Sequence, residues 1–177
     1  MKLTTTERLI LVNQFKILGF LDEDEQEHYR RMVHILTNGY EALYDELDMS
    51  LSEGMRAEDS EFVYDVLDMH LAIRGVAETE GVDINADGNW ALTMRGFDGN
   101  NESELLSFAL FAAREDGSAY SEFLVSDRFP NSHSPSRELH QRMLEEFRAI
   151  GGASGLQAAG VEGLERLKSV AIFPERR

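Results

Sequence analysis

Apolar residues recur at helical spacing along most of this chain, which predicts a fold built from helices. Two successive segments place them at i, i+3, i+4 and i+7: Tyr29, Met32, Val33 and Leu36, followed by Tyr40, Leu43, Tyr44 and Leu47. Gly39 separates the two segments, and it predicts that one amphipathic helix ends there and that a short helix turns away after it.

Start signals define two further helices in the first half of the chain. Thr4 and Glu7 form a capping box before a helix that runs to Leu21. Because this first helix is apolar on most sides, we expect it to be central in the fold. Ser52 is a candidate cap for a long helix that continues to about Thr79.

More helices are predicted after an irregular, glycine-rich stretch that contains a short extended piece, WALTMRGF. Asn101 and Glu104 form a capping box before LLSFALFAARE, and Ser134 followed by Pro135 predicts the start of a helix through ELHQRMLEEFRAI. Residues 151–155, GGASG, have the composition of a link, and VEGLERLKSVA predicts a terminal helix.

These elements predict an all-α fold, a single compact domain of six to seven helices with one long irregular connection around residues 80–101. The length of 177 residues fits one domain. We expect residues 1–150 to form the helical domain. Residues 151–177 are expected to form a glycine-rich link and a C-terminal helix that packs on the same domain or trails it.

Charge and cysteine content restrict the partners and the location. Seventeen basic and thirty-three acidic residues give a net charge of −16, which would repel phosphate backbones and anionic membranes. We therefore expect no direct nucleic-acid binding and no membrane binding. The chain has no cysteine, which excludes disulfides and thiolate zinc sites and fits a reducing cytoplasm. The apolar run near the N-terminus is interrupted by polar residues and predicts neither a membrane span nor a cleaved leader.

Residues 83–94, DINADGNWALTM, resemble the beginning of a calcium-binding EF-hand loop. Asp83, Asn85 and Asp87 alternate and Gly88 stands at the sharp turn, but the twelfth position, which requires a bidentate carboxylate, is Met94. Asn and Asp side chains in such stretches also bond to their own backbone in turns. We therefore favour a turn, with calcium binding by the three alternating residues as the alternative.

Two polar phrases, each at a predicted helix start, contain the candidate ligand-binding residues. The first, GFDGNNESE at 96–104, supplies Asp98, Asn100, Asn101 and Glu102; the second, at 131–134, supplies Asn131, Ser132 and His133. Capping alone explains Asn101, although free amides at a helix start also suit a small carboxylate or phosphate. For His133, an acid–base role and simple loop hydrogen bonding are both open.

Four runs resemble the YfbU family of small bacterial and archaeal proteins: LTTTERLILVNQFKIL, DVLDMHLAI, GFDGNNE, and NSHSP followed by HQRML. The resemblance covers residues 3 to about 150 and implies a helical fold. In some family architectures the domain lies beside a helix-turn-helix domain, which implies a ligand-binding role. The motif positions carried over are Asp98, Gly99, Asn100, Asn101 and Glu102, with Asn131, Ser132 and His133, and the resemblance assigns none of them a catalytic role.

Three functional hypotheses follow. The leading one is a non-enzymatic cytoplasmic module that binds a small polar ligand at the 97–102 turn and the 131–134 loop. The second is a homo-oligomeric interaction module anchored by exposed aromatic residues such as Tyr40, Tyr44 or Trp90. The third is a hydrolase-type enzyme that uses His133 with Asp98 or Glu102. No cofactor motif is recognised, and we expect no cofactor.

Overall fold

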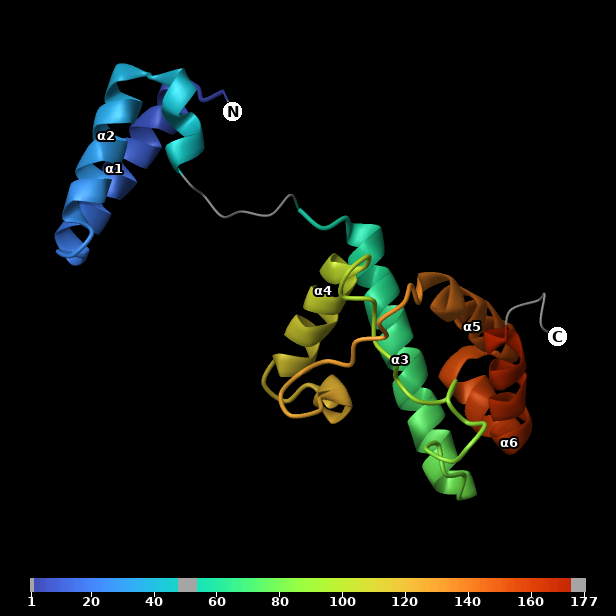
Figure 1. Cartoon of the computed structure of the whole chain (residues 1–177). Helices are drawn as coiled ribbons and strands as arrows, with labels where there is room; N and C mark the ends of the chain where they lie inside the picture. The colour runs from blue at the N-terminus through green and yellow to red at the C-terminus, as the bar shows by residue number, and fades with distance from the viewer. Residues whose placement is uncertain (1, 48–53, 173–177) are drawn as a thin grey trace. The chain divides into compact units, whose positions relative to one another are not determined.

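The computed structural model, which describes residues 2–47 and 54–172, confirms the all-α prediction (Figure 1). This described part contains six α-helices and two short 3₁₀ helices, none of them long and apolar enough to cross a membrane. Backbone contacts divide the chain into two compact units, Met1–Gly54 and Met55–Arg177, a division that the sequence did not predict. The predicted cap at Ser52 lies outside the described residues.

The first unit is a helical hairpin closed by a 3₁₀ helix. It contains α1 (Thr5–Leu21), α2 (Gln26–Asn38) and η1 (Glu41–Leu47). The predicted capping box of α1 is present, and α2 ends at Gly39, which adopts the left-handed conformation. A small core joins the three elements: Val12, Met32, Ile35, Leu36, Tyr44 and Leu47. Because Tyr44 belongs to this core, it is not the exposed anchor that the sequence suggested.

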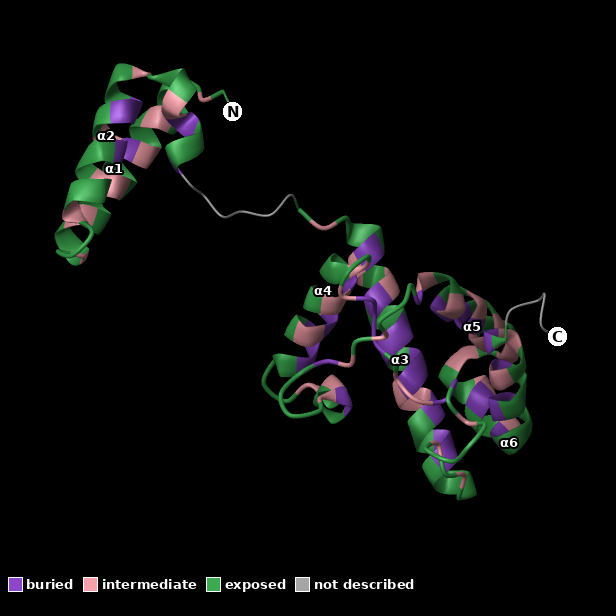
Figure 2. Ribbon diagram, viewed as in Figure 1, coloured by how far each residue is buried: buried purple, intermediate pink, exposed green. Residues whose placement is uncertain are grey.

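The prediction that the first helix is central and buried is wrong for this unit. Of the α1 residues, only Val12 is buried, and the helix is mostly exposed or intermediate along its length (Figure 2). One apolar side of α1 packs on α2, whereas the opposite side also carries large apolar side chains that nothing in the unit covers. α1 is thus apolar on most sides, yet within the described part of this unit α2 is the one α-helix that packs against it.

The second unit is built around the long helix α3 (Ala57–Glu80). This helix contacts α4 (Ser103–Arg114), the 3₁₀ helix η2 (Ala119–Phe123), α5 (Arg137–Ile150) and α6 (Gly152–Ala171). Buried residues accordingly lie on several sides of α3, and they form one core with residues of the surrounding helices (Figure 2). The helix ends at Glu80 with Gly81 as its C-cap, close to the predicted end near Thr79.

The glycine-rich segment 151–155 is not the link that its composition predicted. Gly151 ends α5, and α6 begins at the next residue, so the segment forms a tight turn and the first turn of a helix. α6 packs against both α3 and α5 and contributes Leu156, Leu164 and Leu167 to their core. Its place in the unit follows from this buried apolar stripe.

The long irregular connection between α3 and α4 spans residues 81–102. Its predicted extended piece is reduced to Phe97, which forms a parallel bridge with Asn131. Two predicted helix starts are displaced. α4 begins at Ser103 and α5 at Arg137, and neither Asn101 nor Ser134 is the N-cap residue.

Gly160 provides a test of this packing, because its backbone conformation inside α6 is open only to glycine. Its φ is 55° and its ψ is −131°, and an added Cβ would lie 3.1 Å from a carboxylate oxygen of Glu80. We expect Gly160→Ala to lower the free energy of unfolding by about 1–3 kcal/mol. The matched variant Gly75→Ala, on an open face of α3, should raise it by about 0.5–1 kcal/mol. Urea denaturation measures both values, and equal effects would contradict the assignment.

Candidate functional site

The two polar phrases predicted from the sequence lie side by side. Phe97 and Asn131 form the parallel bridge, and the N–H of Ser132 donates to the carbonyl of Phe97 at 3.2 Å. The side chain of Asn131 extends the contact, since its Oδ1 accepts from the N–H of Gly99 at 3.2 Å and from that of His133 at 2.9 Å. We call residues 96–102 and 130–134 together the loop junction.

Gly96 makes this close approach possible. Its φ is 75°, and a Cβ added there would lie 1.6 Å from the carbonyl oxygen of Pro130, far inside van der Waals contact. Its own carbonyl accepts from Ser136 Oγ at 3.0 Å and from His140 Nε2 at 3.1 Å. The backbone of one loop is thus fixed directly against the other loop and against the start of α5.

Glu102 is the polar centre of the junction. Its carboxylate accepts from the N–H of Asp98 at 3.0 Å, from the N–H of Ser136 at 3.0 and 3.1 Å, from Ser136 Oγ at 2.9 Å and from the N–H of Arg137 at 2.8 Å. Burial acts to raise the pKa of Glu102, but these donors outweigh burial and lower it. Glu102, which directly precedes α4, therefore caps the N-terminus of α5 from a distant segment, and it occupies the place where an anionic ligand would sit.

Asp98 is buried, with 1% of its surface exposed, and its carboxylate bonds within its own turn. Its Oδ2 accepts from Asn101 Nδ2 at 2.6 Å and its Oδ1 from the N–H of Asn100 at 3.0 Å. These two bonds lower the pKa of Asp98 below its usual value. The assignment of Asn101 as a helix cap is wrong, because its side chain serves the turn before the helix.

The remaining predicted residues lie nearer the surface. His133 is exposed with a positive φ of 54°, and Asn100 and Asn131 are exposed as well. Ser132 is half-buried, and its Oγ donates to the carbonyl of Ser134 at 2.7 Å. The structure thus brings all seven predicted residues together, but five of them form hydrogen bonds with other parts of the junction through their side chains.

A buried carboxylate with two arginine partners beside the junction was missed by sequence reasoning. Asp59 on α3 accepts from Arg137 at 2.7 Å and from Arg56 at 2.9 Å. The Arg56 and Arg137 bonds lower the pKa of Asp59. The Arg137 guanidinium also lies over the ring of Phe62, 4.9 Å from its centroid. The two contacts of Arg137 have no local sequence signal, because they join α5 to α3, whereas Arg56 lies only three residues before Asp59.

Two buried histidines lie beneath the junction. His70 and His140 meet edge to face with ring centroids 5.6 Å apart, and His140 also contacts Phe97. Within the described residues, both ring nitrogens of His70 and Nδ1 of His140 are buried without a hydrogen-bond partner. Burial, followed by the neighbouring His140, lowers the pKa of His70 to about 3, and burial lowers that of His140. Both rings are therefore neutral at physiological pH.

Two pockets flank the junction and differ in charge. The larger, about 470 Å³, is lined by Asp59, Glu102 and Glu104 together with Arg137, which already pairs with Asp59. The other, about 270 Å³, includes Trp90, Arg95, Ser132, Ser134, Leu139 and Ile172. No aspartate or glutamate is among the described residues that line this second pocket, which we call the Arg95 pocket.

Residues 83–94 form the hydrogen bonds expected of a turn whose Asn and Asp side chains bond to nearby backbone groups. Asp83 Oδ1 accepts from the N–H of Asn85 at 2.9 Å, and the carbonyl of Asp83 accepts from Asn89 Nδ2 at 2.7 Å. Met94, at the position where an EF-hand requires a carboxylate, packs against the hydrophobic core.

The comparison with protein-family models agrees with the sequence motifs. The model described as the YfbU domain matches residues 1–162 of this chain. The match includes the hairpin unit, the loop junction, α5 and about half of α6.

The capping role of Glu102 is tested by Glu102→Gln. The amide nitrogen would face backbone N–H groups instead of accepting from them, so we expect the free energy of unfolding to fall by about 2–3 kcal/mol. Glu104→Gln is the matched control two residues away, because this exposed side chain makes no hydrogen bond within the described residues, and it should change stability by less than about 0.5 kcal/mol. Equal losses in urea denaturation would refute the role.

The histidine pair predicts a loss of stability in mild acid. In the unfolded chain, His70 binds a proton below its pKa of about 6.5. In the folded chain, the same ring stays neutral down to a pKa of about 3, so the unfolded state is favoured as the pH falls below 6.5. Stability is therefore complete above pH 6.5, and His70 alone should remove on the order of 2 kcal/mol between pH 7 and pH 5. Urea denaturation across this range should show a flatter dependence for His70→Leu. The exposed-histidine control His28→Gln should keep the original slope, and identical slopes would contradict this account.

Proposed function

The chain belongs to the YfbU family, and we propose that it is a non-enzymatic module that binds a small organic anion in the Arg95 pocket beside the loop junction. The observation that carries this proposal is a cation in a pocket whose described lining contains no acidic side chain, on a chain with a net charge of −16. A guanidinium placed in this way attracts a carboxylate and offers it paired N–H donors.

No carboxylate in the described part of the chain binds the guanidinium of Arg95. Within the described residues, Arg95 forms no ion pair, whereas the arginines at positions 31, 56, 74, 114, 137, 148 and 166 each pair with Asp or Glu. The guanidinium of Arg95 lies over the ring of Trp90, with its carbon 5.5 Å from the ring centroid. A cation held over an aromatic face keeps its outward N–H groups available.

The rest of the lining suits an apolar body attached to the anionic group. Leu139, Ala171 and Ile172 supply apolar surface, and Ser132 and Ser134 supply hydroxyl groups at the rim. Trp90 is 41% exposed and offers a ring face for stacking. At about 270 Å³ the pocket is close to the lower end of the range for small-molecule sites, so a monocarboxylate of metabolite size fits it best.

This proposal moves the ligand from the junction to its edge. We infer that Asp98, Asn101, Glu102 and Asn131 position the loops, because their side chains bond to one another and to backbone groups. Ser132 then lies where the junction meets the pocket.

The geometry gives less support to a hydrolase. Asp98 and Glu102 both have lowered pKa values and accept several hydrogen bonds, so they are poor acceptors for a further proton. His133 is exposed, and its own N–H is bonded to Asn131. We place the proposed binding activity in the cytoplasm, since a chain without cysteine suits a reducing compartment.

Binding of monocarboxylates tests the proposed function. We expect benzoate, phenylacetate or hexanoate to raise the melting temperature of the protein and benzyl alcohol to leave it unchanged. At a concentration one hundred times Kd the stabilisation is about 2.7 kcal/mol. Arg95→Gln should raise Kd at least about tenfold.

The matched control is Arg128→Gln, which removes an exposed arginine of the same unit outside the pocket and should leave Kd unchanged. A stabilisation that the alcohol reproduces, or one that Arg95→Gln leaves intact in calorimetric titration, would disprove the proposal.

A further inference from the structure

The side of α1 that faces away from α2 is a largely apolar surface. Its large side chains are Leu9, Ile10, Ile17, Phe20 and Leu21, which are between 52% and 85% exposed. We call this surface the outer face of α1. Monomeric soluble proteins rarely leave a contiguous apolar patch of more than a few hundred Å² in water.

The outer face has the spacing of a helix–helix contact. Ile10, Asn13, Ile17 and Phe20 are separated by three, four and three residues, which is the seam of two helices that pack at a shallow angle. Asn13 is the polar residue in this seam, and a single Asn at such a position fixes the register between partner helices.

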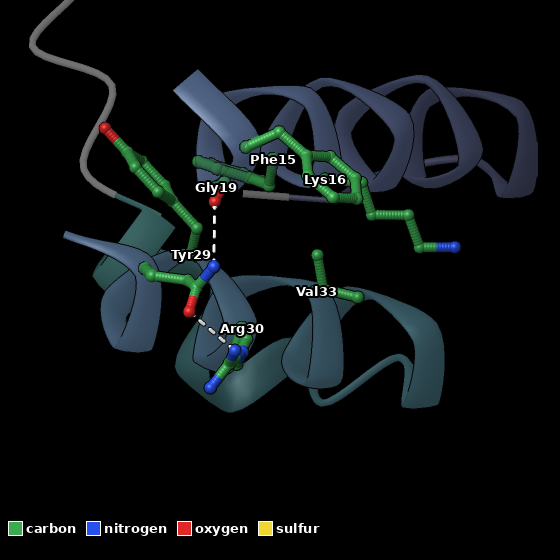
Figure 3. A pocket seen from close by; sticks show the side chains of 8 residues that line it. Phe15, Lys16, Gly19, Tyr29, Arg30 and Val33 are labelled. Atoms are coloured by element: carbon green, nitrogen blue, oxygen red, sulfur yellow. Dashed lines mark hydrogen bonds between the residues drawn. The ribbon is translucent and has the colours of Figure 1, made fainter. Parts of the chain in front are cut away.

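A groove of about 330 Å³ opens beside this face, between α1 and α2 (Figure 3). Phe15 and Lys16 line it from α1, and Tyr29, Arg30 and Val33 line it from α2. Gln26 crosses the end of the groove and donates to the carbonyl of Gly19 at 3.2 Å. Lys16 and Arg30 are the charged residues of the lining, and no acidic side chain is among its described members.

Phe20 connects the groove with the outer face. It lines the groove, yet 85% of its surface is exposed, so it projects at the rim. A projecting apolar side chain and an apolar groove thus lie next to each other on one surface. A two-fold dimer requires this combination, because the same patch must supply both the projecting group and its receptor.

The area and the charge of the surface also fit a second copy. At roughly 100 Å² for each half-exposed large side chain, the outer face offers on the order of 500 Å², and with the groove it approaches the about 800 Å² that each partner buries in a standard dimer. Residues 8–21 contain no aspartate or glutamate, although the whole chain carries a charge of −16. Two copies can meet at this face without bringing carboxylates together, whereas the overall charge opposes binding to an anionic membrane.

We propose that a second copy of this chain covers the outer face of α1 and the adjacent groove, forming a symmetric homodimer. Phe20 and Ile17 are its apolar anchors. This inference does not rest on the proposed ligand, because its residues all belong to the hairpin unit and the Arg95 pocket belongs to the other unit.

The test is the molar mass of the full chain, measured by light scattering and by sedimentation over a range of concentrations. We expect twice the monomer mass of 20.0 kDa, with a dissociation constant that falls at high salt as charge repulsion is screened. The variant Ile17→Gln with Phe20→Gln should raise that constant by about a hundredfold, since both copies lose the anchors. Circular dichroism should show unchanged helix content, because the replaced side chains are exposed.

The control is Phe111→Gln on α4, which removes a 56% exposed aromatic residue and should leave the dimer intact. A monomer at all concentrations would overturn the proposal and would indicate that this face is covered within one chain. A dimer that survives the double variant would overturn it as well. Binding to vesicles of phosphatidylcholine and phosphatidylserine by a chain that stays monomeric would assign the face to lipid instead.

Discussion

The Glu102 carboxylate is the point on which the second unit depends. It gathers backbone N–H groups from its own turn and from the start of α5, thirty-four and thirty-five residues further along the chain. A helix N-terminus carries unpaired N–H groups and a partial positive charge, so an internal anion satisfies both at once. This charge acts beside the bridge between Phe97 and Asn131 to hold the long connection before α4 against the loop before α5. The helices on either side of α3 are therefore linked by polar as well as apolar contacts.

The polar groups of the loop junction favour a structural role for it. Buried polar atoms are tolerated when each finds a partner, and the carboxylates of Asp98 and Glu102 find theirs in the junction and at the start of α5. The histidine pair below it is different, because nitrogen atoms without partners are buried there at a cost. A ligand-binding site would keep free hydrogen-bonding groups facing the solvent or the ligand. Arg95 fits that description better than the residues of the junction.

Sequence rules succeeded where the partners are neighbours in the chain. The capping box of Thr4 and Glu7 and the left-handed glycines Gly39 and Gly81 depend on residues only a few positions away. The same rules failed at Ser134, because Glu102 caps α5 from a distant segment, and at Asn101, because its side chain bonds to Asp98 in the turn before α4. The two polar phrases were identifiable from composition, but their meeting rests on a bridge between Phe97 and Asn131 that no local pattern encodes. Periodicity likewise recognised α1 as a helix without indicating how few neighbours it has.

Gly96 has an implication for how the sequences of such chains can diverge. The carbonyl of Pro130 occupies the space where any side chain would begin, so this position is closed to every other amino acid while the loop crossing is kept. The first part of the turn, residues 83–89, is exposed for the most part and is tied by bonds to its own backbone, so it is less restricted than Gly96. The part of the motif that indicates the same crossing of the two loops is therefore the set Gly96, Asp98 and Glu102. A relative that lacks it would have a different loop junction, even where its helices align with those of this chain.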